Sequence, residues 1–204
     1  MDSARLDGII EGIRSGPADE LQGCCEDIMR LWRIAPVDEL LSLKEQFRKL
    51  GMEQREASLE EALISIAEKR PDPFTRIVTE PGHPLWRPAV EVLSMVDNKE
   101  YLELFISLLP LCPKKDLCDL VRAIGCFDCA RAVEALDGLL GSQDESVALE
   151  AVLALKRCGA GSVAEEAREA LRESLSKGTS IASVVEAVLK DMECGANRIN
   201  PRSN

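Results

Sequence analysis

Residues 159–164, Gly-Ala-Gly-Ser-Val-Ala, fit the G-x-G-x-x-A form of a dinucleotide-binding turn. In such a turn the glycines follow a strand and let the backbone approach a pyrophosphate, and an acidic residue about 20 positions on binds the ribose. Here the segment before Gly159 has helical periodicity, and the sequence around residue 181 is Ile-Ala-Ser. We therefore interpret Gly159 and Gly161 as a joint between two helices.

A cluster of thiols invites a second chemical interpretation, because four cysteines fall within 18 residues: Cys112, Cys118, Cys126 and Cys129. A structural zinc site typically uses paired C-x-x-C knuckles, and this segment has only one. As a redox pair it is poorly tuned, since Asp128 next to Cys129 opposes thiolate formation. Helical packing of small apolar thiols is the preferred interpretation, and metal binding or redox chemistry at these four stays open.

Acid–base and nucleophilic chemistry find little support in the remaining residues. His83 is the only histidine, and it sits in the turn Pro81-Gly-His-Pro84, where we expect a solvent-facing loop. Glutamates such as Glu169 and Glu173 are one helical turn apart on a polar face, where solvation explains them. We expect no catalytic, cofactor-binding or metal-binding residue, no cofactor and no enzyme activity.

The charge balance narrows the range of partners. The chain has 36 acidic and 25 basic residues, a net charge of −11, and no basic cluster. That field repels nucleic acid and anionic membranes, so another protein or a peptide is the expected partner. No apolar run approaches the roughly 18 residues that span a bilayer, and the first residues lack a signal-peptide pattern. We expect a cytoplasmic protein with reduced cysteines.

The elements that carry these residues repeat every 31 positions. Leu93, Ile124 and Leu155 share one column, and neighbouring columns are also apolar: Ala89/Leu120/Ala151, Val90/Val121/Val152 and Val92/Ala123/Ala154. A second helix repeats in the same register, with Leu102/Val133/Ala164, Phe105/Leu136/Ala167, Leu108/Leu139/Ala170 and Leu109/Leu140/Leu171. Each unit has the spacing of an amphipathic helix. The repeat predicts helical hairpins that bury each other's apolar faces.

Signals for helix starts recur with the same period. Asp97 and Asp128 share a column just before a helix, where a carboxylate can accept bonds from backbone N–H groups. Residues 142–145 and 162–165, beginning at Ser142 and Ser162, fit the capping box.

The rest of the chain is predicted less regularly. Helices are expected over 36–50, 58–69 and 181–193, with a short one around 74–79 inside a proline-rich segment. The first 33 residues predict two helices broken at Ser15-Gly-Pro17, and the tail from Gly195 to Asn204 is expected to be disordered.

Residues 144–159, with Asp144, Val147, Ala151, Ala154-Leu155 and Gly159, resemble the second helix of a HEAT-type repeat, the armadillo-like short variety also found in phycobilin lyases. Ala123-Ile124-Gly125 is similar to the end of that helix. The resemblance covers roughly 84–193. It departs from the pattern at Ala148, where the family usually has arginine and where Trp86 stands in the first unit. The resemblance implies a fold rather than a specific activity.

Together these patterns predict an all-α chain, an α-solenoid of stacked antiparallel helical hairpins with about 11 helices. The predicted organisation is an irregular helical region over 1–83, HEAT-like repeats over 84–194, and the tail 195–204. We expect a protein-interaction scaffold that binds through a concave wall, and an accessory subunit of a lyase is the alternative. Trp86 is expected to be partly exposed, and the candidate partner contacts are Trp86, Arg87, Glu91, Asp119, Arg122 and Glu150. The oligomeric state stays undetermined.

Overall fold

A computed structural model describes residues 3–80, 82–159, 161–178 and 180–199. The chain forms two compact units, Met1–Asp97 and Asn98–Asn204. Every regular element in the described residues is a helix, twelve α-helices and one short 3-10 helix, which confirms the all-α prediction.

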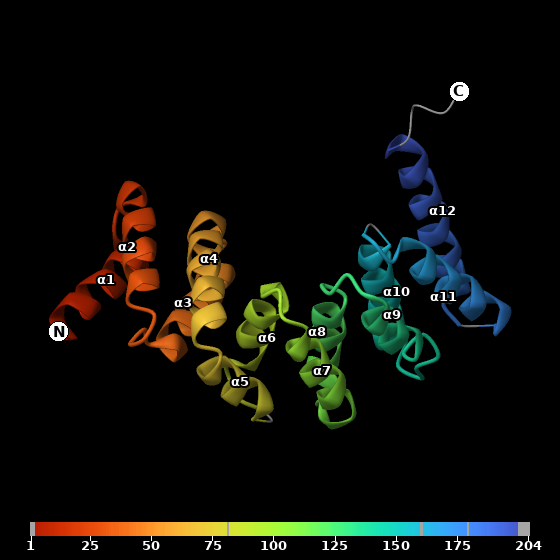
Figure 1. Ribbon diagram of the computed structural model, residues 1–204, viewed down its shortest axis with the longest axis horizontal. Coiled ribbons are helices and arrows are strands. Elements are labelled where there is room, and N and C mark those ends of the chain that lie inside the picture. Colours follow the sequence, from red (N-terminus) through yellow and green to blue (C-terminus); the bar gives the residue numbers. More distant parts are fainter. Residues whose placement is uncertain (1–2, 81, 160, 179, 200–204) are drawn as a thin grey trace. The chain divides into compact units, whose positions relative to one another are not determined.

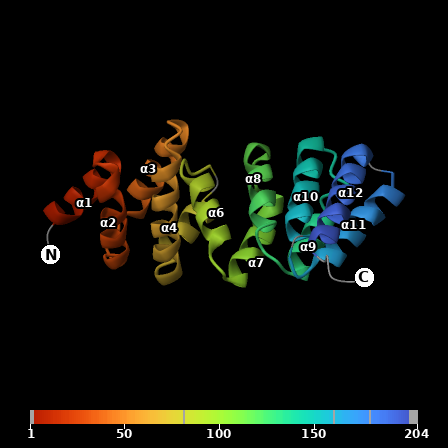
Figure 2. The ribbon, with the colours of Figure 1, turned by 90° about the horizontal axis from the view of Figure 1, so that it is seen from above.

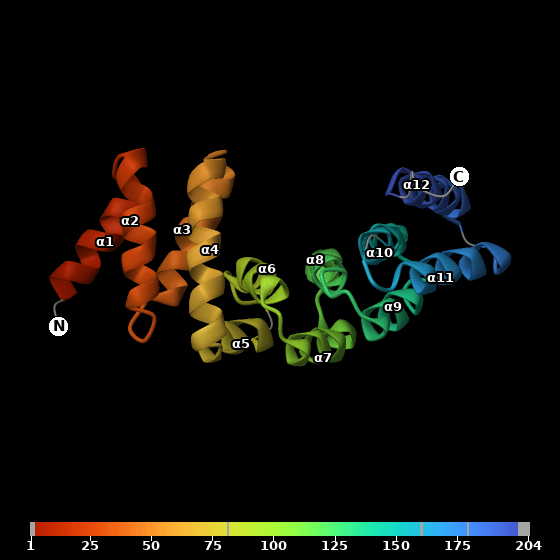
Figure 3. The same cartoon turned by 45° about the horizontal axis from the view of Figure 1, so that its top comes forward.

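The first unit stacks three helical hairpins (Figure 1). Its helices are α1 (Ser3–Ser15), α2 (Ala18–Arg30), α3 (Val37–Lys49), α4 (Glu53–Lys69), α5 (Asp72–Thr79) and α6 (Trp86–Met95). Helix α4 packs against α2, α3 and α6, so the even-numbered helices form one layer and the odd-numbered helices the other (Figure 3). The break at Ser15-Gly-Pro17 and the short helix in the proline-rich segment are confirmed.

The second unit follows the same two-layer plan. It contains α7 (Lys99–Leu108), a 3-10 turn η1 (Leu109–Leu111), α8 (Lys114–Ile124), α9 (Ala130–Asp137), α10 (Glu145–Cys158), α11 (Ala164–Ser176) and α12 (Ala182–Ile199). Helix α10 packs against α8 and α12 within one layer, and α9 packs against α11 in the other. Within each unit the helices lie side by side (Figure 2). Stacked hairpins of this kind are the α-solenoid arrangement that the repeat predicted.

Burial confirms the 31-residue register. Leu93, Ile124 and Leu155 are all 0% exposed, and the three neighbouring columns of α6, α8 and α10 are buried throughout. In the second set of helices, Phe105, Leu136 and Ala167 are also fully buried, whereas the other three predicted columns each contain half-buried members: Ala164, Leu108, Leu139 and Leu109. Equivalent positions on α6, α8 and α10 therefore share an apolar environment. Burial of apolar surface is the dominant favourable contribution to the free energy of folding.

Helix starts follow the expected chemistry at different residues. Helix α7 is capped by Asn98, whose Oδ1 accepts a hydrogen bond from the Glu100 N–H at 2.9 Å, so the expectation for Asp97 is wrong. Helix α10 is capped by Asp144 rather than by the predicted box at Ser142, because the Asp144 carboxylate reaches the Ser146 N–H at 3.1 Å. A shift of one or two residues in the first helical residue moves the capping position with it.

The C-terminal helix is longer than expected. Helix α12 continues to Ile199, whereas the sequence predicts a disordered tail from Gly195, and residues 200–204 lie outside the described residues. Helix α6, assigned to the repeat array from sequence, lies in the first compact unit. Within the described residues, no helix combines the length and apolarity needed to cross a bilayer.

Candidate functional site

The six residues expected to contact a partner fall into two groups. Trp86, Arg87 and Glu91 lie on α6 in the first unit. Asp119 and Arg122 on α8 and Glu150 on α10 lie in the second unit, where the structure brings all three together.

Trp86 corrects one expectation from the sequence, because it is buried rather than partly exposed. Its side chain is 6% exposed, and its indole Nε1–H donates a 2.9 Å hydrogen bond to the carbonyl oxygen of Val78 at the end of α5. Tryptophan takes a buried position where its N–H finds an acceptor. Trp86 therefore joins α6 to α5 and offers little surface to a partner.

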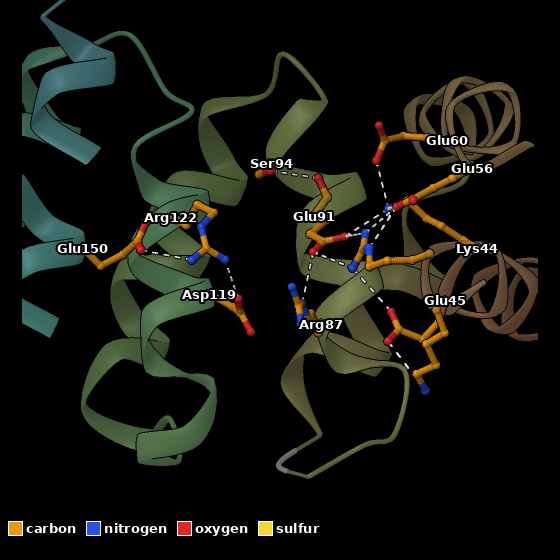
Figure 4. A network of polar contacts seen from close by, with 12 residues as sticks. Lys44, Glu45, Glu56, Glu60, Arg87, Glu91, Ser94, Asp119, Arg122 and Glu150 are labelled. Carbon is orange, nitrogen blue, oxygen red and sulfur yellow. Dashed lines mark hydrogen bonds and ion pairs between the residues drawn. The ribbon is translucent and has the colours of Figure 1, made fainter. Parts of the chain in front are cut away.

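Glu91 belongs to a network of charges centred on a buried lysine. The side chain of Lys44, on α3, is 0% exposed. Its Nζ lies 2.9 Å from Glu60 Oε1, 3.0 Å from Glu91 Oε2 and 3.5 Å from Glu56 Oε1. These carboxylates come from α4 and α6, so one ammonium group ties three helices together (Figure 4).

Arg48 extends the same network by one helical turn. Its guanidinium donates to both carboxylate oxygens of Glu91 and, through Nε, to Glu56 at 2.9 Å. Glu45 on α3 and Arg87 on α6 lie at its edge, at 3.4 Å from Arg48 and 3.3 Å from Glu91. We call this set the Lys44 network: Lys44, Glu45, Arg48, Glu56, Glu60, Arg87 and Glu91.

The electrostatics of the Lys44 network favour a structural role. Burial by itself raises the pKa of Glu91, but hydrogen bonds from Arg48 and the charge of Lys44 outweigh it and hold the pKa below its usual value. Burial likewise lowers the pKa of Arg48, but hydrogen bonds and charge from Glu91 and Glu56 raise it overall. A general acid or base needs a pKa near the working pH, and these shifts lead away from it.

Lys44 is not among the residues predicted from the sequence, although its spacing in α3 indicates a buried position. Lys44 follows Leu40 by four residues and precedes Phe47 by three, which places it on the buried stripe of α3. A lysine there requires buried anionic partners, because an unpaired buried charge is too costly. The glutamates of α4 at Glu56 and Glu60 were the available candidates.

The second group centres on Arg122 and connects two repeats. Arg122 Nη1 donates to Asp119 Oδ1 at 2.7 Å on its own helix, and Nη2 donates to Glu150 Oε2 at 3.0 Å on α10. Arg157 joins from α10, with Nη2 lying 3.5 Å from Glu150 Oε1 and donating to the Arg122 carbonyl oxygen at 3.2 Å. We call these four residues the Arg122 cluster: Asp119, Arg122, Glu150 and Arg157.

Within the Arg122 cluster, the positively charged side chains are more exposed than the negatively charged ones. The side chains of Arg122 and Arg157 are 46% and 40% exposed, whereas those of Asp119 and Glu150 are 17% and 12% exposed. Burial lowers the pKa of Arg122, but hydrogen bonding and charge from Glu150 and Asp119 raise it overall, so it stays charged. Leu153, one helical turn from both Glu150 and Arg157, is 43% exposed. This face combines fixed guanidinium groups with an accessible apolar side chain.

Arg157 was not among the predicted contacts, yet the repeat register indicates it. Position 157 is the 31-residue equivalent of Cys126, and 150, 153 and 157 share one helix face at i, i+3 and i+7. The glutamate at 150 and the arginine at 122 were predicted on the same wall. The sequence does not show that Arg157 completes the cluster through the Arg122 carbonyl.

The glycine-containing stretch is a helix joint, as predicted. Gly159 is the C-terminal cap of α10, and Gly161 precedes α11, while Ala160 between them lies outside the described residues. A Cβ atom at Gly161 would overlap the Asp128 carboxylate, and one at Gly159 would overlap Met192. Close approach of the hydrogen-bonded Asp128 carboxylate accounts for Gly161, whereas the atom nearest to a Cβ at Gly159 is the flexible end of Met192, which can move aside.

Asp128 takes part in this joint and not in its own helix start. Its carboxylate accepts hydrogen bonds from the backbone N–H groups of Ser162 at 2.8 Å and Val163 at 3.4 Å, and these bonds, led by that of Ser162, lower the pKa of Asp128. The predictions that Asp128 caps the following helix and that Ser162 begins a capping box are therefore wrong, because α9 begins after Cys129 and Val163 caps α11. The bond to Ser162 connects consecutive repeats.

The cysteines differ in burial: Cys25 and Cys158 are buried, whereas Cys126 and Cys194 are exposed. Burial raises the pKa of the Cys158 thiol to about 11, and its Sγ contacts the Gly125 and Phe127 carbonyl oxygens at 3.8 Å. Burial also raises the pKa of Cys112 to about 11. In the described part of the chain, no group of three or more histidine, cysteine, aspartate or glutamate residues could hold a metal ion. His83 is half-buried, and its Nδ1 accepts a 3.1 Å hydrogen bond from the Leu85 N–H.

Comparison with known proteins gives only distant structural likeness. No protein-family model and no curated protein matches the chain. Among solved structures, an engineered protein from a structural genomics consortium shares 15% identity over 96% of this chain and 98% of its own, with a TM-score of 0.45. A designed armadillo repeat protein shares 16% identity over 92% of this chain and 99% of its own, with a TM-score of 0.41.

Proposed function

We propose that this chain is a helical repeat protein that binds another protein or peptide through one surface of the second unit. We call this surface the α8–α10 face; it consists of the Arg122 cluster and Leu153. The observation that carries the proposal is the Arg122 guanidinium held between Asp119 on its own helix α8 and Glu150 on α10, with the exposed Leu153 one helical turn from Glu150. Arginine is enriched among the residues that dominate binding energy. A side chain already fixed by its neighbours also loses less entropy when a partner binds.

The other residues that the sequence predicts as partner contacts differ in whether the proposal keeps them as contacts. Glu91 sits inside the Lys44 network, so it supports the shape of the first unit rather than a partner. Arg87 is exposed on α6 and remains a candidate contact, whereas Trp86 is buried and is no longer proposed to contact a partner. Asp119 and Glu150 are less exposed and hold the guanidinium groups by ion pairs. Of Asp119, Arg122 and Glu150, Arg122 is the proposed contact with a partner.

The test compares partner capture by the wild-type chain with capture by variants of this face. We expect Leu153→Ser combined with Arg157→Gln to remove a specific set of proteins captured from the native lysate, measured by quantitative mass spectrometry. The matched control is Lys156→Gln, one residue away on α10, because Lys156 pairs with Asp191 of α12 instead of with the Arg122 cluster. Equal capture by all three chains, each shown to be folded by circular dichroism, contradicts the proposal.

The lyase-subunit alternative implied by the HEAT resemblance receives no specific support. Such a role requires a groove with a reactive side chain. One surface hollow lies between the starts of α3 and α5 and another beside the ends of α9 and α11, and neither is lined by a cysteine or a histidine. A constant visible spectrum on mixing the chain with a bilin would count against this alternative.

A further inference from the structure

The chemistry of the α8–α10 face indicates what kind of partner it accepts, an inference that rests on the proposed function. Asp119 and Glu150 are largely buried, and they direct the guanidinium group of Arg122 outward. Arg157 is also outward-facing, so the two accessible charges of the Arg122 cluster are both positive. The chain is strongly acidic as a whole, yet the accessible charged groups of this cluster are cationic.

The hydrogen-bonding capacity of the two guanidinium groups is only partly used. Arg122 donates through Nη1 and Nη2 to its carboxylates, and Arg157 donates through Nη2 to a carbonyl oxygen. Among the described residues these are the side-chain hydrogen bonds of both groups. Each guanidinium has five N–H donors in a fork that matches a carboxylate, so donors of Arg157 remain for an acceptor from outside.

The apolar component of the face lies between the charges. Leu153 is exposed and stands between Glu150 and Arg157 on α10, with Leu149 half-buried beside it. Leu153 is also the repeat equivalent of Arg122, so α8 offers a guanidinium at the position where α10 offers a leucine. A partner that satisfies both helices must supply an acceptor and an apolar side chain close together.

We propose that this face binds a peptide segment in which an aspartate or glutamate stands next to a leucine-like side chain. The partner's carboxylate pairs with Arg157 and Arg122, and its apolar side chain covers Leu153. The net charge of −11 opposes approach of an acidic segment from a distance. Physiological salt screens that repulsion beyond about 8 Å, and the contacts at the face form within this distance.

A random dodecapeptide library displayed on phage, panned against the full chain, tests the inference without knowledge of the natural partner. We expect the enriched sequences to pair an acidic residue with leucine, isoleucine, methionine or phenylalanine. Each enriched peptide is then synthesised with a fluorophore, together with a version in which its carboxylates are replaced by amides. Fluorescence anisotropy measures the dissociation constant for the wild-type chain and for variants.

The variants separate charge recognition from simple adhesion. Arg157→Gln is expected to weaken binding of the acidic peptide by about tenfold, the scale of one lost charge-assisted hydrogen bond. Lys156→Gln removes the same charge from the same helix and is expected to leave affinity within about twofold. Replacing the peptide's carboxylates by amides is expected to weaken binding at least as much as Arg157→Gln does, and the loss from both changes together is expected to be smaller than the sum of the two separate losses.

Two other outcomes overturn the inference, and they are distinguishable. Peptides that lose binding in Leu153→Ser but are unaffected by Arg157→Gln or by amide replacement show that the face binds partners of another chemistry, so the proposed function stands and the acidic partner is wrong. A library that yields no peptide dependent on Leu153 or Arg157 removes both this inference and the proposed surface. Thermal unfolding of each variant confirms that loss of binding is not loss of fold.

Discussion

The Asp128 carboxylate occupies the space that a side chain at Gly161 would require. It also accepts the backbone N–H groups of Ser162 and Val163, so the loop after α8 is bonded directly to the loop after α10. Gly161 has no positive φ, so its backbone conformation is open to any residue, and the three atoms that a Cβ there would meet first all belong to the Asp128 carboxylate. The contact therefore couples two positions that lie far apart in the sequence.

The first prediction follows from that coupling. Gly161→Ala is expected to reduce the free energy of unfolding by about 1–3 kcal/mol through overpacking. In an Asp128→Ala background the same change is expected to be neutral or slightly stabilising, because the atoms nearest to the added Cβ are then removed and alanine restricts the unfolded chain. Urea unfolding of the four chains in a double-mutant cycle measures the coupling. Additive effects would show that the carboxylate does not exclude the Cβ.

The second prediction concerns the buried ammonium group of Lys44. Lys44→Met is expected to lower the free energy of unfolding by about 2–4 kcal/mol, because Glu56, Glu60 and Glu91 lose a shared cation; this is near the low end of the range for broken buried ion pairs, since the carboxylates keep some solvent contact. Lys49→Met, on the same helix but exposed, is the matched control and is expected to change stability by less than about 0.5 kcal/mol. A similar loss in both variants contradicts the role of Lys44.

The third prediction is a pH dependence carried by Glu91. Its pKa is lowered in the folded chain, mainly by Arg48 and Lys44 acting against burial, so the folded state holds this proton less tightly than the unfolded state. Its contribution to stability is therefore present above the ordinary glutamate pKa and is lost as pH falls through the lowered value. Urea unfolding between about pH 6 and 3 measures the free energy of unfolding at each pH. This free energy is expected to change less steeply with pH in Glu91→Gln than in the wild-type chain.

A matched substitution keeps the pH experiment specific. Glu68→Gln removes a carboxylate from the exposed face of α4 and is expected to leave the slope unchanged. If both variants show the wild-type slope, the charge of Glu91 makes no measurable contribution to acid sensitivity.

The fold could be predicted from the sequence because buried apolar residues recur at a fixed interval. Leu93, Ile124 and Leu155 recur at a fixed interval, and a fixed interval in a stacked array means the same environment. Helix ends were less accessible. Asn98 and Asp97 are adjacent and both can cap, so which one does depends on the backbone conformation at the start of α7.

The candidate site was only partly accessible for a different reason. Arg122, Asp119 and Glu150 were placed on one wall by the register, and the structure brings them into contact. The bond from Arg157 to a carbonyl oxygen and the burial of Trp86 depend on how neighbouring helices pack. Periodicity within one helix carries no information about the distance to the next helix.

The final prediction uses the thiols to report on burial residue by residue. Cys126 is exposed at the end of α8, whereas Cys158 is buried with its pKa raised to about 11, mainly by burial. Only the thiolate reacts with iodoacetamide, so at pH 8 Cys126 is expected to be labelled in the folded chain, while Cys158 is labelled only on unfolding. Peptide mass spectrometry of chains labelled with and without urea distinguishes the two sites. Rapid labelling of Cys158 in the folded chain would show that the α10 core opens, and the register that places Cys158 against Gly125 and Phe127 would then be wrong.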